Sequence, residues 1–158
     1  MEDSIRGGLY YGMSSAAITA LGLMIGLNSG TKSQTVVLAG LLTMALADSL
    51  SDALGIHLSE ESREDSTGEA VWAATFTTFT SKFIVLLSFI PAIYFLDLEA
   101  AIPLNVLWGF LVVTVLSYQI AVSQNTSPKK AISEHLLIAV VVVLATNFLG
   151  IWISGFAG

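Results

Sequence analysis

Five long apolar runs, separated by short polar segments, limit what this chain can fold into. A transmembrane helix needs about 20 mostly apolar residues to cross the hydrocarbon core of a bilayer, and each run reaches that length. The runs are residues 5–27, 35–58, 70–96, 102–122 and 133–156. We therefore expect an all-α integral membrane protein in which residues 1–158 form a single bundle of five transmembrane helices.

The composition agrees with this class and excludes several others. Only 11% of the residues are charged, whereas soluble domains carry about 25%. The chain has no cysteine, which argues against a disulfide framework or a structural zinc site. The net charge of −6 argues against a nucleic acid partner. We find no HExxH, no glycine-rich phosphate loop and no paired nucleophile and base, so we expect no enzyme.

Lysine and arginine at the ends of the runs predict the orientation. Arg6, Arg63, Lys129 and Lys130 fall on one side of an alternating five-helix path, and Lys32 falls on the other. Because cytoplasmic segments carry the excess of basic residues, we expect the N-terminus in the cytoplasm and the C-terminus outside. The surrounding membrane would be the plasma membrane of a prokaryote or the membrane of an organelle.

Three charged side chains lie inside the apolar runs: Asp48, Asp52 and Lys82. A charge at the centre of a bilayer costs about 2.5 to 3.5 kcal/mol on insertion scales, so each needs a partner or a purpose. Counting residues from the cytoplasmic ends places Asp48 and Lys82 at a similar depth, together with Ser15. We expect an ion pair between Asp48 and Lys82, which is either purely structural or part of an ion pathway.

Asp52 stands one helical turn closer to the cytoplasm than Asp48, on the same face of the second helix. By this count it has no second basic residue to neutralise it. It is therefore our candidate for binding an exchangeable cation or a proton. The alternative is a carboxylate whose side chain reaches the cytoplasmic interface.

An acidic segment follows, and we expect it to continue the second helix beyond the membrane. Four potential ligands there have the spacing i, i+3, i+4 and i+7, which would place them on one helix face. They are His57, Glu60, Glu61 and Glu64. One imidazole and three carboxylates suit Fe²⁺ or Mn²⁺, and we interpret them as a cytoplasmic metal-capture site. A solvated acidic helix end is the alternative.

Small residues recur every four positions on the first helix and let another helix approach closely. The residues are Gly8, Gly12, Ala16, Gly22 and Gly26. We expect them to pack two copies of the chain into a homodimer. Ordinary packing between helices of one chain is the alternative.

Two segments resemble the signatures of the vacuolar iron transporter family. Tyr-Gly-Met-Ser-Ser-Ala at residues 11–16 resembles the family's F-G-L-x-D-G, and residues 51–59, Ser-Asp-Ala-Leu-Gly-Ile-His-Leu-Ser, resemble its S-M-A-x-G-E-Y-x-S. Residues 59–69 are too few for the cytoplasmic metal-binding domain that many members carry, so the chain is similar to the short members. The resemblance implies a homodimeric exporter of Fe²⁺ or Mn²⁺, driven by proton exchange, with its path near the dimer axis.

The chain departs from the family pattern at the residues of the metal pathway. Ser15 stands where the family has an aspartate, and Asp52 stands where it has a methionine. Ile56 and His57 replace its glutamate and tyrosine. One carboxylate is thus lost from the first helix and one is gained on the second.

Together these observations predict a divalent metal transporter surrounded by membrane lipid, with no permanently bound cofactor. Its metal or proton pathway would contain Asp52, Asp48 and Ser15. The alternative is a membrane scaffold or partner-binding protein that transports nothing, in which Asp48 and Lys82 form a structural ion pair.

Overall fold

The computed structural model describes residues 2–157, which form helices joined by short connections. The helices are α1 (Glu2–Thr31), α2 (Gln34–Glu61), α3 (Gly68–Leu87), α4 (Ile90–Phe95), α5 (Leu98–Ser123) and α6 (Pro128–Ala157). Residues 2–157 contain no strand. The expectation of an all-α chain is confirmed.

Five helical segments are long and apolar enough to span a membrane: α1, α2, α3 together with α4, α5 and α6. They match the five predicted runs in number and order, but they extend further into the flanking polar segments. Capping residues set several of their starts. The side chains of Ser33, Thr67 and Asp97 each accept a hydrogen bond from the backbone amide three residues later, at the first turns of α2, α3 and α5.

The third run is not one continuous helix, which corrects the predicted helix over residues 70–96. It is divided into α3 and α4 at Ser88 and Phe89. Pro91 explains the interruption, because it has no amide proton for the Leu87 carbonyl and its ring crowds that carbonyl. Asn105 of α5 donates a hydrogen bond of 2.8 Å to the Phe89 carbonyl, so this buried acceptor is satisfied.

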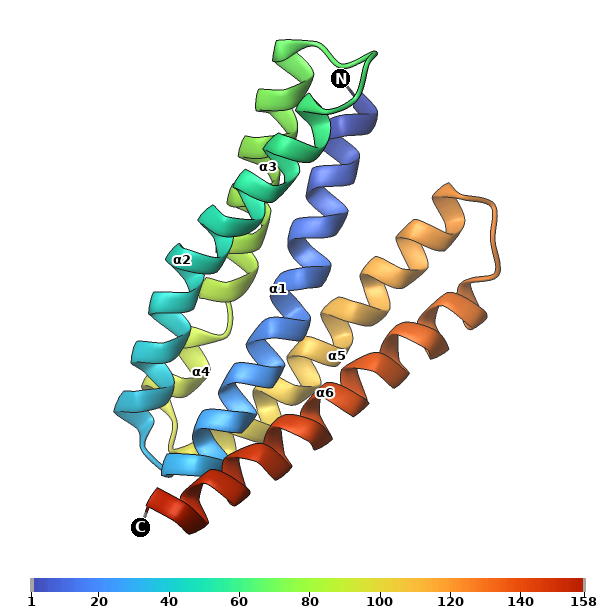
Figure 1. The fold of residues 1–158 in the computed structure, drawn as a ribbon. Helices are drawn as coiled ribbons and strands as arrows, with labels where there is room; N and C mark the ends of the chain where they lie inside the picture. Colours follow the sequence, from blue (N-terminus) through green and yellow to red (C-terminus); the bar gives the residue numbers. More distant parts are fainter. Residues whose placement is uncertain (1, 158) are drawn as a thin grey trace.

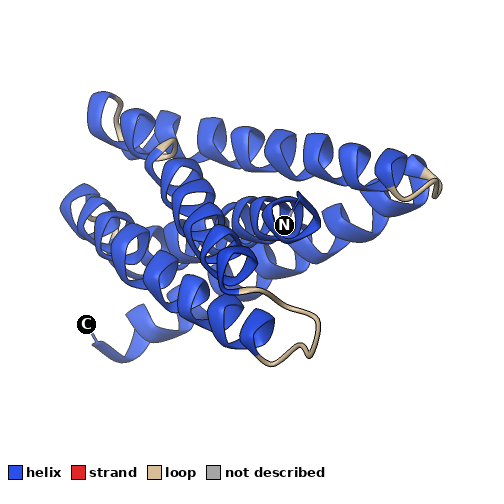
Figure 2. Cartoon of the chain, turned by 90° about the horizontal axis from the view of Figure 1, so that it is seen from above, coloured by secondary structure: helices blue, strands red, loops and turns tan. Residues whose placement is uncertain are grey.

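Helix α1 is the centre of the fold, with α2 and α3 on one side and α5 and α6 on the other. Figure 2, which views the chain from above, shows α1 nearly end-on in the middle of the other helices. Its central position is reflected in its sequence. Ala16, Ala17, Ala20, Leu21 and Met24 have no exposed surface.

Glycines bring α1 and α3 into close contact. A Cβ atom on Gly8 would lie 2.7 Å from the Ala74 carbonyl oxygen, and one on Gly12 would lie 2.7 Å from the Thr78 carbonyl oxygen and overlap Ser81 Oγ. No real Cβ atom tolerates such distances, so only glycine fits at these two positions. The backbones of the two helices therefore meet directly.

A second set of glycines joins α1 to α6 near the other end of the molecule. A Cβ atom on Gly22 would lie 3.0 Å from Val142 Cγ1, and one on Gly150 would lie 3.0 Å from the Gly30 amide nitrogen. Ser29 Oγ also donates a hydrogen bond of 2.5 Å to Asn147 Oδ1. Beyond this contact the hairpin of α5 and α6 diverges from α1, so the distance between them grows toward the α5–α6 connection (Figure 1).

These contacts correct the predicted role of the small residues on α1. Gly8 and Gly12 face α3, Gly22 and Gly26 face Thr146 of α6, and Ala16 is fully buried. All five pack within the chain and leave no small-residue stripe on α1 for a second copy. The homodimer itself stays a prediction.

The outer surface is strongly apolar. On α2, the residues that point inward are mostly small or apolar, as in Leu41, Ala45 and Ala53. The neighbouring stripe of α2, which faces outward, exposes a leucine at every fourth position, each with more than half of its surface accessible. These leucines are Leu42, Leu46, Leu50, Leu54 and Leu58. A continuous apolar stripe of this length suits a lipid environment and is unusual on a soluble monomer.

The ends of the helices separate the basic residues as the sequence predicts. The N-terminal end of α1, the α2–α3 connection and the α5–α6 connection lie at one end of the bundle (Figure 1). Arg6 and Arg63 belong to the first two of these segments, and Lys129 and Lys130 begin α6 directly after the third. Lys32 lies in the α1–α2 connection at the opposite end. The cytoplasmic location of the N-terminus stays a prediction based on this distribution.

Candidate functional site: a buried charge cluster beside a polar cavity

Lys82 of α3 is fully buried, which is rare for a lysine. It is held in place by the close contact between α1 and α3, since a Cβ atom on Gly12 would lie only 3.3 Å from the Lys82 backbone nitrogen. A buried ammonium needs oxygen atoms around all of its protons, and the neighbouring helices supply them.

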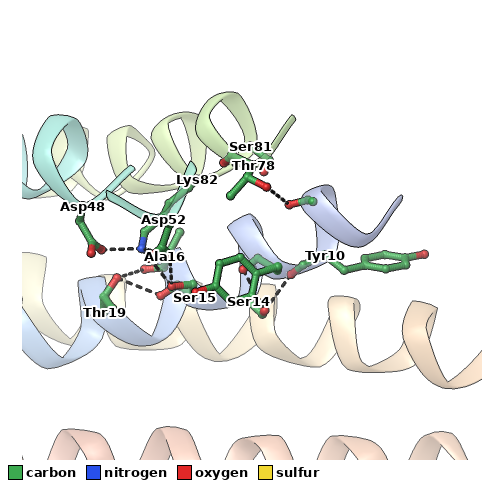
Figure 3. Close-up of polar contacts among 12 residues, drawn as sticks. Tyr10, Ser14, Ser15, Ala16, Thr19, Asp48, Asp52, Thr78, Ser81 and Lys82 are labelled. Atoms are coloured by element: carbon green, nitrogen blue, oxygen red, sulfur yellow. Dashed lines mark hydrogen bonds and ion pairs between the residues drawn. The ribbon is translucent and has the colours of Figure 1, made fainter. Parts of the chain in front are cut away.

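Two carboxylates of α2 meet this lysine. Lys82 Nζ lies 2.6 Å from Asp48 Oδ2, and it also forms an ion pair and hydrogen bond with Asp52 Oδ2. Asp48 and Asp52 are one helical turn apart, so one long side chain from α3 reaches both. Figure 3 shows the three charged side chains converging beside α1.

Ser15 of α1 completes the cluster from the other side. Its hydroxyl accepts a hydrogen bond of 3.0 Å from Lys82 Nζ and donates one of 2.9 Å to Asp52 Oδ2. The ammonium therefore contacts three oxygen atoms, from Asp48, Asp52 and Ser15. Three helices are tied together at this point.

This arrangement contains the expected contact of Asp48 but corrects the prediction for Asp52. The expected ion pair of Asp48 with Lys82 is present. The prediction that Asp52 lacks a basic partner is wrong, because Lys82 pairs with both carboxylates. Asp52 and Asp48 thus belong to one site and not to two successive ones.

The cluster is unbalanced in charge and unequally buried. With two carboxylates and one ammonium its formal charge is −1. The side chain of Lys82 is 1% exposed, that of Asp52 is 17% exposed and that of Asp48 is 30% exposed. A net charge in a low-dielectric interior is unfavourable, so the site favours the binding of a further cation.

A cavity of about 740 Å³ lies between α1, α5 and α6, on the side of α1 away from α2. Tyr11, Ser14 and Ser15 of α1 contribute to its wall. Ser117 of α5 and His135 of α6 line the opposite side and form a hydrogen bond of 2.8 Å with each other. Ser15 therefore contacts both the cavity and the charge cluster.

The predicted metal-capture face at the end of α2 is not formed as expected. Helix α2 ends at Glu61, so Glu64 lies in the connection to α3 and does not continue the face of His57. Ser62 is the C-cap, and Thr67 already caps the start of α3. The short connection must turn the chain back, which is why the helix cannot extend to Gly68.

His57 and Glu60, two of the remaining three residues of that face, have different neighbours. His57 Nδ1 lies 3.0 Å from Thr75 Oγ1, and its ring packs edge-on against Trp72 of α3. Glu60 lies 3.5 Å from Arg63 and accepts a hydrogen bond from Ser4 of α1. Within residues 2–157, no three side chains of the types His, Cys, Asp and Glu are grouped closely enough to hold a metal ion.

Tyr11, Ser117 and His135 line the cavity together, which the sequence did not predict. Ser117 and His135 lie in separate apolar segments, and no spacing rule connects residues of two different helices. The sequence feature that could have indicated each of them is a polar side chain within an apolar run.

Comparison of the chain with protein-family models, with curated proteins and with solved structures finds no match in any of the three. The residues of the cluster and the cavity are therefore the basis for assigning a function. The resemblance to the vacuolar iron transporter family stays an expectation from the sequence.

Proposed function

We propose that this chain is an integral membrane transporter that moves a divalent cation, Fe²⁺ or Mn²⁺, out of the cytoplasm in exchange for protons. The observation that carries the proposal is the cluster of Asp48, Asp52 and the fully buried Lys82, which lies within helices that are long and apolar enough to span a membrane. Ionisable side chains in such helices are rare and usually belong to ion or proton pathways.

The geometry of the two carboxylates suits a single cation. Oδ2 of Asp48 and Oδ2 of Asp52 both contact one nitrogen atom, so a metal ion near that position would reach both oxygens. Carboxylate oxygens are suitable ligands for Mn²⁺, and Ser15 Oγ could add a third oxygen. The transported ion would then compete with the Lys82 ammonium for the same oxygen atoms.

Charge balance depends on the position of the Lys82 ammonium. With the ammonium in place the cluster carries −1, which one monovalent cation would neutralise. If a divalent ion displaces the ammonium from the two carboxylates, the ion and its two ligands carry no net charge, which suits a low-dielectric interior. Exchange of one divalent ion for two protons also moves no net charge across the membrane.

One observation supports a different function. Lys82 already donates hydrogen bonds to Ser15 and Asp52 and forms an ion pair with Asp48, so its charge has partners without any ligand. The cluster could therefore be a structural lock between α1, α2 and α3 in a protein that transports nothing. Such a membrane scaffold is the second candidate.

Flux through the purified protein separates the two candidates. The chain is reconstituted into liposomes that contain a metal-sensitive dye and a pH indicator. We expect Mn²⁺ or Fe²⁺ to cross faster than in protein-free liposomes, with protons moving in the opposite direction. Equal rates with and without protein for every divalent ion tested would favour the scaffold.

A further inference from the structure

The cavity between α1, α5 and α6 opens toward one end of the bundle. Its wall includes Gln124, Thr126 and Ser127, which belong to the end of α5 and the α5–α6 connection. It extends along α6 from Lys130 to Ile138, which are about 12 Å apart along the helix axis. It therefore extends from the α5–α6 connection into the body of the bundle.

The tilt of the α5–α6 hairpin creates this space. Gly150 packs against the backbone of Gly30 near the opposite end, and the hairpin diverges from α1 beyond that contact (Figure 1). The cavity lies on the diverging side of this contact, and its lining reaches the α5–α6 connection.

The inner wall of the cavity is α1, which contributes Ser15 to the charge cluster. Ser15 lines the cavity and forms hydrogen bonds with Lys82 and Asp52. Tyr11 lines the cavity one turn earlier. One layer of α1 side chains therefore separates the cavity from the buried carboxylates.

The lining combines polar and apolar groups, and the larger part of its surface is apolar. Ser14, Ser15, Ser117, Gln124 and His135 contribute the polar groups, which water can solvate. A volume of about 740 Å³ is large compared with the roughly 30 Å³ that one water molecule occupies in the liquid. Lys130 and Glu134 at the outer part form a loose ion pair of 3.9 Å, so the opening carries no strong charge of one sign.

From these contacts we infer that the α1–α5–α6 cavity is a water-filled entrance that leads small cations from the α5–α6 end to Ser15, beside the charge cluster of the same chain. The negative charge of Asp48 and Asp52, which exceeds that of Lys82 by one, would attract cations into it. As a route to a transport site the inference rests on the proposed function. It places this route within one protomer and not on a dimer axis.

Cysteine labelling tests the entrance without depending on transport. The chain has no cysteine, so Ser14→Cys creates a single thiol in the cavity. Leu137→Cys is the matched control, because Leu137 is on α6 next to the lining residue Ile138 but is not part of the wall and is 64% exposed. Each variant is placed in liposomes and treated with a membrane-impermeant cationic methanethiosulfonate, and in parallel with an anionic one.

We expect the cationic reagent to modify Ser14→Cys at least about tenfold faster than Leu137→Cys, because a thiol in lipid does not ionise. The rate of each reagent is divided by its rate with free cysteine. At Ser14→Cys this normalised rate should be higher for the cationic reagent than for the anionic one. Equal modification of the two variants, or no modification of Ser14→Cys in folded protein, would overturn the entrance and indicate a cavity filled by lipid or a second copy.

The failure of this inference and the failure of the proposed function give different results. A modified Ser14→Cys in a protein without metal flux retains the water-filled cavity but contradicts transport. Metal flux through a protein whose Ser14→Cys thiol is inaccessible contradicts the entrance and leaves transport in place.

Discussion

The Ser15 hydroxyl accepts a hydrogen bond of 3.0 Å from the ammonium of Lys82, which joins the central helix α1 to the buried charge of α3. The same hydroxyl donates to Asp52 at 2.9 Å. Ser15 is thus the contact between the charge cluster and the cavity on the other side of α1. Substitutions of Ser15 and of its neighbours measure how much each side chain contributes to stability.

Removal of the Ser15 hydroxyl should destabilise the protein. Ser15→Ala deletes one hydrogen bond to each of two charged groups, and a hydrogen bond to a charged group contributes about 1.5 to 3 kcal/mol. Ser14→Ala is the control, since the Ser14 hydroxyl donates to backbone carbonyls of its own helix. We expect a lower thermal unfolding temperature in detergent for Ser15→Ala than for Ser14→Ala. Equal temperatures would mean that the Ser15 contacts contribute nothing measurable.

Removal of the buried lysine alone should destabilise the protein more than removal of all three charges of the cluster. Lys82→Met leaves two carboxylates without their ammonium, and breaking a buried ion pair costs about 3 to 5 kcal/mol. The triple variant Lys82→Met, Asp48→Asn, Asp52→Asn removes all three charges and should be more stable than Lys82→Met alone. Chemical unfolding in mixed micelles measures the difference. A triple variant less stable than the single one would show that the contacts are not coupled in this way.

The α1–α3 contact should not tolerate a methyl group at Gly12. Gly12→Ala places a Cβ atom against Ser81 Oγ and the Thr78 carbonyl, and overpacking of this kind costs about 1 to 3 kcal/mol. Gly55→Ala on α2 is the matched control, because nothing lies within 4 Å of its Cβ position. There we expect no loss, and up to about 1 kcal/mol of gain from helix propensity. Thermal unfolding of both variants checks the contrast, and equal destabilisation would contradict it.

The break between α3 and α4 should depend on Asn105. Its amide donates to the Phe89 carbonyl at 2.8 Å, and Asn105→Leu would leave this buried acceptor unpaired, at about 1 to 3 kcal/mol. Trp108→Phe removes an exposed hydrogen bond to Ser88 at the same break and should cost less. Proteolysis rates of the two purified variants compare their stability. A more resistant Asn105→Leu would mean that the break needs no such support.

The five long apolar helical segments could be predicted because the length of an apolar run is a local property of the sequence. The partner of Asp52 could not be predicted by counting depth alone. One helical turn is about 5.4 Å, which is within the reach of a lysine side chain, so Lys82 contacts both carboxylates although residue counting matches it to Asp48.

The glycines of α1 predicted a close helix contact but not its partner. Small residues permit close approach by any helix, and in this chain α3 and α6 occupy the sites that were assigned to a second copy. The cavity was equally beyond sequence reasoning, because it depends on the tilt that follows from the contact of Gly150 with Gly30. Tertiary geometry decided both cases.

Metal flux in the Asp52→Asn variant tests the central claim most directly. The amide keeps the size and can still bond to Ser15, but it removes one of the two charges that would bind the cation. We predict that reconstituted Asp52→Asn inserts and folds but carries no Fe²⁺ or Mn²⁺ above protein-free liposomes, whereas Glu64→Gln in the α2–α3 connection carries as much as the unmutated chain. Undiminished flux through folded Asp52→Asn would contradict the proposed site.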